Sequence, residues 1–183
     1  MRHVAKNFTK KGMMIFMLNQ IFTRPSGEKI NGENLIKIIS NYILADTKAT
    51  YEFTVGTDSQ SYDKTKMVEV IAVHRVGKGG IFFYNVEYIN RIQSLRQKIT
   101  EETQRSLTIA DGLLEALELD LIDHDVDIDD LDIKFQIHCD IGHEGKTKAL
   151  IKEITNWVTS LGYDCLIKPD SYTASGIANK YSK

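Results

Sequence analysis

The order of the periodic segments after residue 50 constrains the fold more than any other feature of the sequence. Apolar and polar residues alternate over 51–58, 68–76 and 81–89, which predicts three strands. Short polar or glycine-containing turns join these strands, so we expect an antiparallel meander. Apolar residues then recur at helical spacing over 91–118 and 147–160, and each of these predicted helices precedes another short strand.

The two later strands, 133–139 and 163–167, decide the topology of the predicted sheet. A helix joins them, and such a crossover connects parallel strands with a right-handed turn. A final short helix is predicted over 171–180. We therefore predict an α/β domain with a five-stranded mixed sheet flanked by helices. In chain order, strands one to three are antiparallel, and strands one, four and five are parallel.

Residues 1–48 are predicted to form an N-terminal extension, and residues 49–183 the main domain. Within the extension, 33–46 has the apolar spacing of one amphipathic helix. A Pro-Ser-Gly turn signal precedes this helix at 25–27. Residues 1–20 are expected to be irregular or strand-like.

The composition fits a globular protein that can bury a core. Of the 183 residues, 42% are hydrophobic and 26% are charged, and the formal net charge is -2. Non-specific nucleic-acid coat proteins are usually basic, which argues against that class, although net charge does not exclude a basic path on one face. The chain has two cysteines, Cys139 and Cys165, and no segment approaches the ~20 apolar residues of a membrane helix. We expect a cytoplasmic protein with no membrane attachment.

Four carboxylates occur where a sheet of this topology would bring them together. Asp58, Asp140 and Asp170 end or follow the strands that should run parallel, and Glu102 lies on the apolar stripe of the long helix. Parallel strands deliver their carboxyl ends to one edge of a sheet. Clustered carboxylates repel one another unless they are protonated or neutralised by a cation, and oxygen-rich sites suit Mg²⁺ or Mn²⁺. A pair of such ions can activate water and stabilise the leaving oxygen in phosphodiester hydrolysis.

Three motifs carry a resemblance to a known family: GTDSQ at 56–60, HCDIG at 138–142 and KPDSYTAS at 168–175. Together with the order of strands and helices, they resemble the YkuK-type family of bacterial ribonuclease H-like proteins over residues 22–183. The resemblance implies a divalent-metal-dependent nuclease, with nucleic acid as the expected partner and Mg²⁺ or Mn²⁺ as the cofactor.

On the positions that match, the resemblance implies that Asp58 bridges the metal ions. Glu102, Asp140 and Asp170 would complete the shell of metal ligands and so form the catalytic group. Position 179 is an asparagine where relatives often carry an acid. This departure motivates an alternative function, a non-catalytic module that binds nucleic acid or protein. The acidic segment 118–132 and the modest net charge also favour that alternative.

Each of the four acids has a simpler structural explanation. Asp58 could stabilise a turn. Glu102 could be a solvated residue in the first turn of its helix, where its charge suits the helix dipole. Asp140 could cap the next helix, and Asp170 could be an N-cap that follows a proline.

The segment from Asp140 to Thr147 resembles a phosphate-binding Walker A loop, but its first glycine is replaced by Asp140. A carboxylate there would face the phosphates, so we disfavour a nucleotide site. Two residues of this segment remain candidates, His143 as a proton carrier and Lys146 as a contact for a substrate phosphate.

Three other site types are also disfavoured. The acids at 123, 125 and 127 begin a calcium loop that fails at Ile128 and Lys134. A zinc site is disfavoured because His138 and Cys139 are adjacent on a strand and point to opposite faces. The segment 56–59 is similar to the phosphate loop of actin-like ATPases, which need two such domains.

Overall fold

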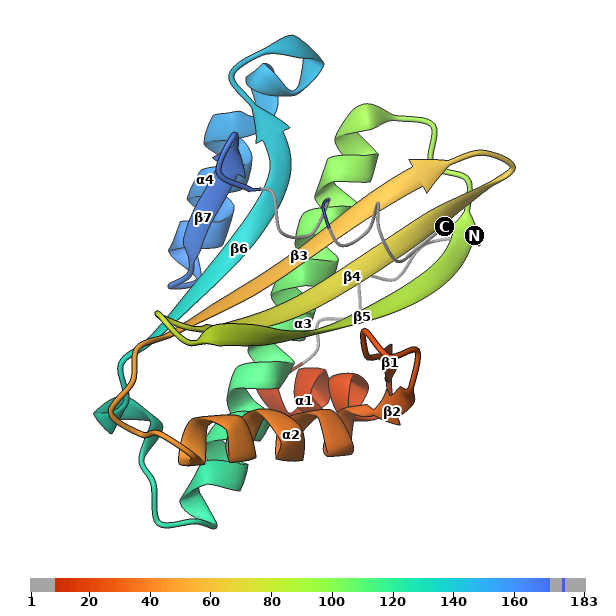
Figure 1. Cartoon of the computed structure of the whole chain (residues 1–183). Helices are drawn as coiled ribbons and strands as arrows, with labels where there is room; N and C mark the ends of the chain where they lie inside the picture. Colours follow the sequence, from red (N-terminus) through yellow and green to blue (C-terminus); the bar gives the residue numbers. More distant parts are fainter. Residues whose placement is uncertain (1–8, 172–175, 177–183) are drawn as a thin grey trace.

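The computed structural model describes residues 9–171 and residue 176, and Figure 1 shows its helices gathered against a long twisted sheet. The strands are β1 (Ile21–Thr23), β2 (Lys29–Asn31), β3 (Tyr51–Ser61), β4 (Lys64–Arg75), β5 (Gly79–Asn90), β6 (Ile133–Gly142) and β7 (Asp164–Lys168). The α-helices are α1 (Lys10–Leu18), α2 (Gly32–Leu44), α3 (Leu95–Ile122) and α4 (Ile151–Ser160), and two 3-10 helices are η1 (Ile128–Asp130) and η2 (Gly145–Leu150).

The sheet is mixed, and its strand order is β2-β1-β5-β4-β3-β6-β7. The predicted topology of the main strands is confirmed, because β3, β4 and β5 pair antiparallel while β3, β6 and β7 pair parallel. The predicted number of strands is wrong, since the described residues form seven strands and not five. The additional hairpin of β1 and β2 joins the edge of β5 through Thr23 and Tyr84. Its strands are three residues long, which is too short for an alternating pattern to be visible in the sequence.

Residues 10–18 form helix α1, so the expectation of an irregular or strand-like segment over 1–20 is wrong for this part. Thr9 caps the helix by accepting a hydrogen bond from the backbone N–H of Gly12 at 3.2 Å. Met17 is fully buried, and the backbone of α1 lies so close to Gly112 of α3 that a Cβ there would be 2.6 Å from the Met13 carbonyl oxygen. A short apolar run does not distinguish a buried helix from a buried strand, which explains the error.

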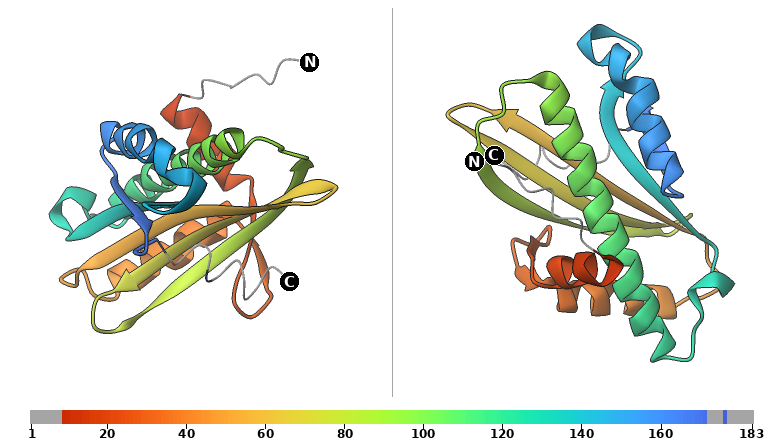
Figure 2. Two further views of the ribbon diagram at one scale, coloured as in Figure 1. Left: turned by 90° about the horizontal axis from the view of Figure 1, so that it is seen from above. Right: turned by 180° about the vertical axis from the view of Figure 1, so that it is seen from behind.

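Helices α3 and α4 pack on one face of the sheet, as the view from behind shows (Figure 2). Helix α1 packs mainly against α3, and α2 packs against α3 and the hairpin of β1 and β2. Tyr51, Phe53 and Val55 of β3 point into the shared core with these helices. The Tyr51 hydroxyl donates to the carbonyl oxygen of Tyr42 at 3.1 Å and so ties α2 to β3. The opposite face carries a smaller apolar cluster centred on Val68 and Val70. The helix predicted over 171–180 lies almost entirely outside the described residues.

None of the helices in the described part of the chain is both long enough and apolar enough to span a membrane.

Candidate functional site

The candidate site lies where β3 and β6 separate. Their parallel pairing runs from Tyr51 opposite Ile133 to Gly56 opposite His138 and then stops. Beyond this point β3 remains paired with β4, β6 remains paired with β7, and Figure 1 shows the carboxyl ends of β3 and β6 diverging. Open α/β sheets bind ligands beyond the carboxyl ends of neighbouring strands.

Asp58 and Asp140 each lie two residues beyond the last pair of β3 and β6. The prediction that both acids end their strands is wrong in detail, because β3 continues to Ser61 and β6 to Gly142. Burial raises the pKa of Asp58, and the negative charge of Asp140 raises it further. The two carboxylates therefore interact electrostatically across the gap between the strands.

Glu102 reaches β3 from the helix layer. Its side chain is buried, and its Oε1 accepts a hydrogen bond of 2.7 Å from the hydroxyl of Ser59. Burial is the largest cause of a pKa raised to about 7, and the charges of Asp58 and Asp140 act in the same direction. A solvated position in the first helical turn is thus excluded for Glu102.

Glu102 and Asp58 approach β3 from opposite sides. The hydroxyls of Thr57 and Ser59 contact α3, and side chains alternate along a strand, so Asp58 between them points to the other face. The charge of Asp58 consequently acts on Glu102 from the other side of the strand. Among the residues that the structure describes, no three His, Cys, Asp or Glu side chains are grouped closely enough to hold a metal ion.

Two lysines accompany these carboxylates, and the sequence analysis missed both. Lys168 Nζ is 2.7 Å from Asp140 Oδ1, and Lys98 Nζ is 3.7 Å from Glu102 Oε1. Both ammonium groups also lower the pKa of Asp58, against the larger effect of its burial. Lys98 lies one helical turn before Glu102, so its spacing could have identified it. Lys168 ends β7 beside Asp140 of β6, a pairing that depends on the register of the two strands.

Asp170 makes no contact with this group within the described residues. It is exposed in the turn after β7, where its backbone N–H donates to the carbonyl oxygen of Ile167 at 2.9 Å. No hydrogen bond or ion pair within residues 9–171 joins its side chain to the other three acids. Its role as a ligand stays a prediction, and Asn179 lies outside the described residues.

His143 and Lys146 are exposed beyond the end of β6. Lys146 belongs to η2, so the Asp140–Thr147 segment leads into a 3-10 helix and not into the α-helix that follows a phosphate-binding loop. The roles proposed for these two residues stay predictions.

A network of charged residues centred on the buried Glu69 holds the N-terminal half of α3 against the sheet. Arg105 of α3 lies 2.9 Å from Glu69 of β4 and also pairs with Glu87 of β5 and Glu101 of its own helix. Glu69 is almost completely buried. This network fixes the helix that carries Glu102, and the sequence analysis did not identify it.

The geometry around His138 and Cys139 does not support a zinc site. The Cys139 thiol faces the Cys165 thiol on β7, with the sulfur atoms 3.8 Å apart. Burial lowers the pKa of His138 to about 4, so this imidazole is neutral at physiological pH.

Comparisons with known proteins agree with the sequence motifs. A family model described as Ribonuclease H-like matches residues 34–183. The "Uncharacterized protein YkuK" of Bacillus subtilis (strain 168) is 35% identical over 167 residues, which are 89% of this chain and 97% of that protein. No solved structure matches the chain.

Proposed function

Since the chain belongs to the ribonuclease H-like family and is similar to YkuK over most of its length, we propose that it is a divalent-metal-dependent nuclease. The substrate would be a nucleic acid, and the reaction the hydrolysis of a phosphodiester bond. One observation carries the proposal: Asp58, Asp140 and Glu102 come from three separate elements, and the charge of Asp140 raises the pKa of both Asp58 and Glu102.

The donor set fits a hard divalent cation. Carboxylate oxygens are the preferred ligands of Mg²⁺ and Mn²⁺. Mutual repulsion and burial destabilise the charged forms of Asp58 and Glu102, which is the situation that a bound cation relieves. Asp58 and Asp140, whose side chains lie on the same face of the sheet, would hold the ion, and Asp170 would join them if its turn lies closer when the ion binds. Glu102 would add negative charge from the other side of β3. When bound, such an ion supplies a more acidic water and stabilises charge on the phosphate.

The remaining polar residues have roles that follow from their contacts. Lys98 and Lys168 neutralise the carboxylates in the absence of a cation. Once a cation holds the carboxylates, these ammonium groups would be free to contact the phosphates of the nucleic acid. Ser59 orients Glu102, and Arg105 holds the helix that carries it.

The proposal is tested by incubating the protein with single-stranded RNA, single-stranded DNA and an RNA–DNA hybrid, with Mg²⁺, Mn²⁺ or EDTA. We expect cleavage of at least one substrate, dependent on the metal and lowered on the order of a hundredfold or more by Asp58→Asn. Asp129→Asn is the matched control, because Asp129 is an exposed acid in η1. Failure to cut any substrate, or cleavage that persists in Asp58→Asn, would reject the nuclease.

A second candidate is a module that binds nucleic acid without cutting it. The ion pair between Lys168 and Asp140 favours this candidate, because the ammonium group occupies a carboxylate that a catalytic cation would need. Salt-dependent binding of nucleic acid with no cleavage, together with no heat of Mn²⁺ binding in calorimetry, would support it.

A further inference from the structure

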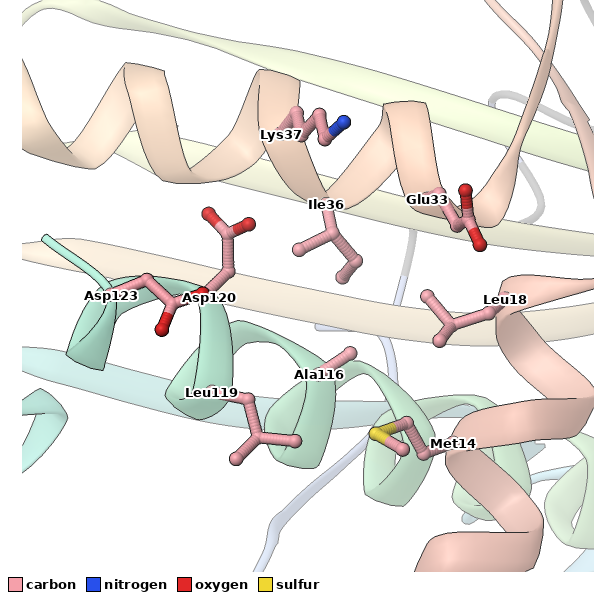
Figure 3. Close-up of a pocket in the computed structure, with 9 residues that line it drawn as sticks. All are labelled: Met14, Leu18, Glu33, Ile36, Lys37, Ala116, Leu119, Asp120 and Asp123. Atoms are coloured by element: carbon pink, nitrogen blue, oxygen red, sulfur yellow. The ribbon is translucent and has the colours of Figure 1, made fainter.

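A groove between α1, α2 and α3 lies far from the candidate site. Glu102 and Ala116 are separated by 14 positions of α3, or about 21 Å at the rise of an α-helix. The close-up in Figure 3 shows apolar side chains from all three helices pointing into the groove. These are Met14 and Leu18 of α1, Ile36 of α2, and Ala116 and Leu119 of α3.

The size and surroundings of the groove suit a protein segment. Its volume is about 280 Å³. Pockets for complete small-molecule ligands usually occupy about 300–1,000 Å³, so this groove has room for one or two apolar side chains. Leu119, which lines the groove, and Ile122, one helical turn further along α3, are 51% and 55% exposed and extend the apolar surface.

Charged residues surround the apolar floor, and most of them are acidic. Figure 3 shows Glu33, Asp120 and Asp123 at the rim together with a single cation, Lys37. None of these three carboxylates takes part in an ion pair within the described part of the chain. They are therefore available to a cationic partner.

The charge of the surrounding chain has the same sign. No lysine or arginine occurs from Ser106 to Ile133, whereas ten aspartates and glutamates do. Asp120 and Asp123 also lie at the carboxyl end of α3, where the helix dipole disfavours negative charge. These acids do not stabilise their own helix, and together they produce a negative field that repels nucleic acid and attracts a basic surface.

We propose that this groove docks a basic amphipathic helix of a partner protein. One or two apolar side chains of that helix would insert between α1, α2 and α3, and lysines or arginines beside them would pair with the rim carboxylates. Docking an amphipathic helix into an apolar groove is an established mode of peptide recognition. The unbranched, flexible side chain of Met14 can pack against apolar side chains of different shapes. This surface is separate from the carboxylates that carry the proposed nuclease function.

The test uses the full chain and synthetic peptides. The first peptide carries leucines at helical i, i+3, i+4 and i+7 spacing with flanking lysines. One control has the same residues in scrambled order, and another has glutamates in place of the lysines. Binding is measured by fluorescence anisotropy, and its location by NMR of ¹³C-labelled methionine methyl groups. We expect only the first peptide to bind. It should shift the NMR signal of Met14 and leave unchanged the signal of Met67, which is fully buried within β4.

Matched variants separate a specific groove from a diffuse negative charge. Asp120→Asn/Asp123→Asn and Asp129→Asn/Asp130→Asn remove the same charge, but only the first pair lines the groove. We expect the first double variant to weaken binding about fivefold or more and the second to change it less than twofold. Equal weakening by both variants, binding of the scrambled peptide with the same affinity, or an unshifted Met14 signal would overturn the proposal. A dimer in sedimentation whose interface covers Met14 would overturn it in favour of a second copy of the chain.

Discussion

The two ends of helix α3 carry opposite charges in opposite environments. Lys98 lies near the amino end, and Asp120 and Asp123 lie near the carboxyl end, so each end holds the charge that the helix dipole disfavours. At the amino end, Lys98 is half-buried and pairs with Glu102 of the same helix, and Glu102 also accepts a hydrogen bond from Ser59 of the sheet. At the carboxyl end, the carboxylates are not ion-paired with any described residue. The placement of charge at both ends therefore points to binding and not to helix stability.

The difference in burial decides how each end acts. Glu102 is 5% exposed, so its ionisation depends strongly on the few groups that touch it. A cation or a proton at this position changes the local free energy by a large amount. Solvated carboxylates such as Asp123 interact weakly with any one neighbour but add to a field that reaches about a Debye length, ~8 Å at physiological salt. The amino end of α3 therefore suits the binding of a single ion or proton, and the carboxyl end suits weak attraction of an extended charged surface.

The largest expected effect comes from breaking the buried network at the amino end. Arg105→Met leaves Glu69 buried without its main cationic partner, and such a change typically costs about 3–5 kcal/mol of the free energy of unfolding. Urea denaturation measures the cost. Arg96→Met is the matched control, because the Arg96–Glu153 pair is exposed on both sides and should contribute about 1 kcal/mol or less. If both variants lost the same free energy of unfolding, the burial of Glu69 would not make the Arg105 pair stronger than the exposed Arg96 pair.

A second prediction concerns the pH dependence of stability. The pKa of Glu102 is about 7 in the folded protein against 4.5 as its ordinary value, so the folded state binds the proton more tightly. The contribution of Glu102 to the free energy of unfolding is therefore greatest below pH 4.5. It falls by up to about 3 kcal/mol as the pH rises from 4.5 through 7. Asp58 and Glu69, whose pKa values are also raised mainly by burial, contribute in the same direction.

Glu102→Gln isolates this contribution, because glutamine can still accept the hydrogen bond from Ser59 and cannot ionise. In EDTA, the variant should gain stability relative to the wild-type protein as the pH is raised from 5 to 8. Asp120→Asn, at the other end of α3, should leave the slope of stability against pH nearly unchanged. A Glu102→Gln variant with the wild-type slope would contradict the assignment.

The sequence predicted the main sheet well because long strands and helices carry strong periodic signals. It failed where polar residues continue a strand. Ser59, Gln60 and Ser61 looked like the start of a turn, but they extend β3, and Ser59 faces the polar part of α3. A strand that packs on polar helix residues does not show the alternation expected of a strand over an apolar core.

The candidate site was only partly predictable for a related reason. Asp58 and Asp140 could be placed beside each other from strand order, since parallel strands end at one edge of a sheet. The pairing of Lys168 with Asp140 and of Arg105 with Glu69 joins segments that are distant in sequence. Such pairs depend on the register of the strands and the rotation of α3 about its axis, neither of which local periodicity determines.

A smaller effect should follow from removing a lysine at the amino-end site. Lys168 competes with any cation for Asp140. Because this ion pair is partly exposed, it should contribute about 1 kcal/mol or less of interaction free energy. Lys168→Met should therefore bind Mn²⁺ about two- to fivefold more tightly in calorimetry. Lys134→Met is the control, since Lys134 is exposed on the same strand as Asp140. Unchanged or weaker Mn²⁺ binding by Lys168→Met would show that the lysine does not compete for this carboxylate.

A comparably small effect is expected at the carboxyl end of α3, and its sign is opposite to that of Arg105→Met. Asp120→Asn/Asp123→Asn removes charge that the helix dipole disfavours, so the free energy of unfolding should rise by about 0.5–1 kcal/mol at low salt. The gain should shrink in 0.5 M NaCl, because salt screens exposed charges. Urea denaturation at the two salt concentrations measures both values. A loss of stability would mean that these carboxylates make stabilising contacts within the chain, and it would remove the argument that they are placed there for a partner.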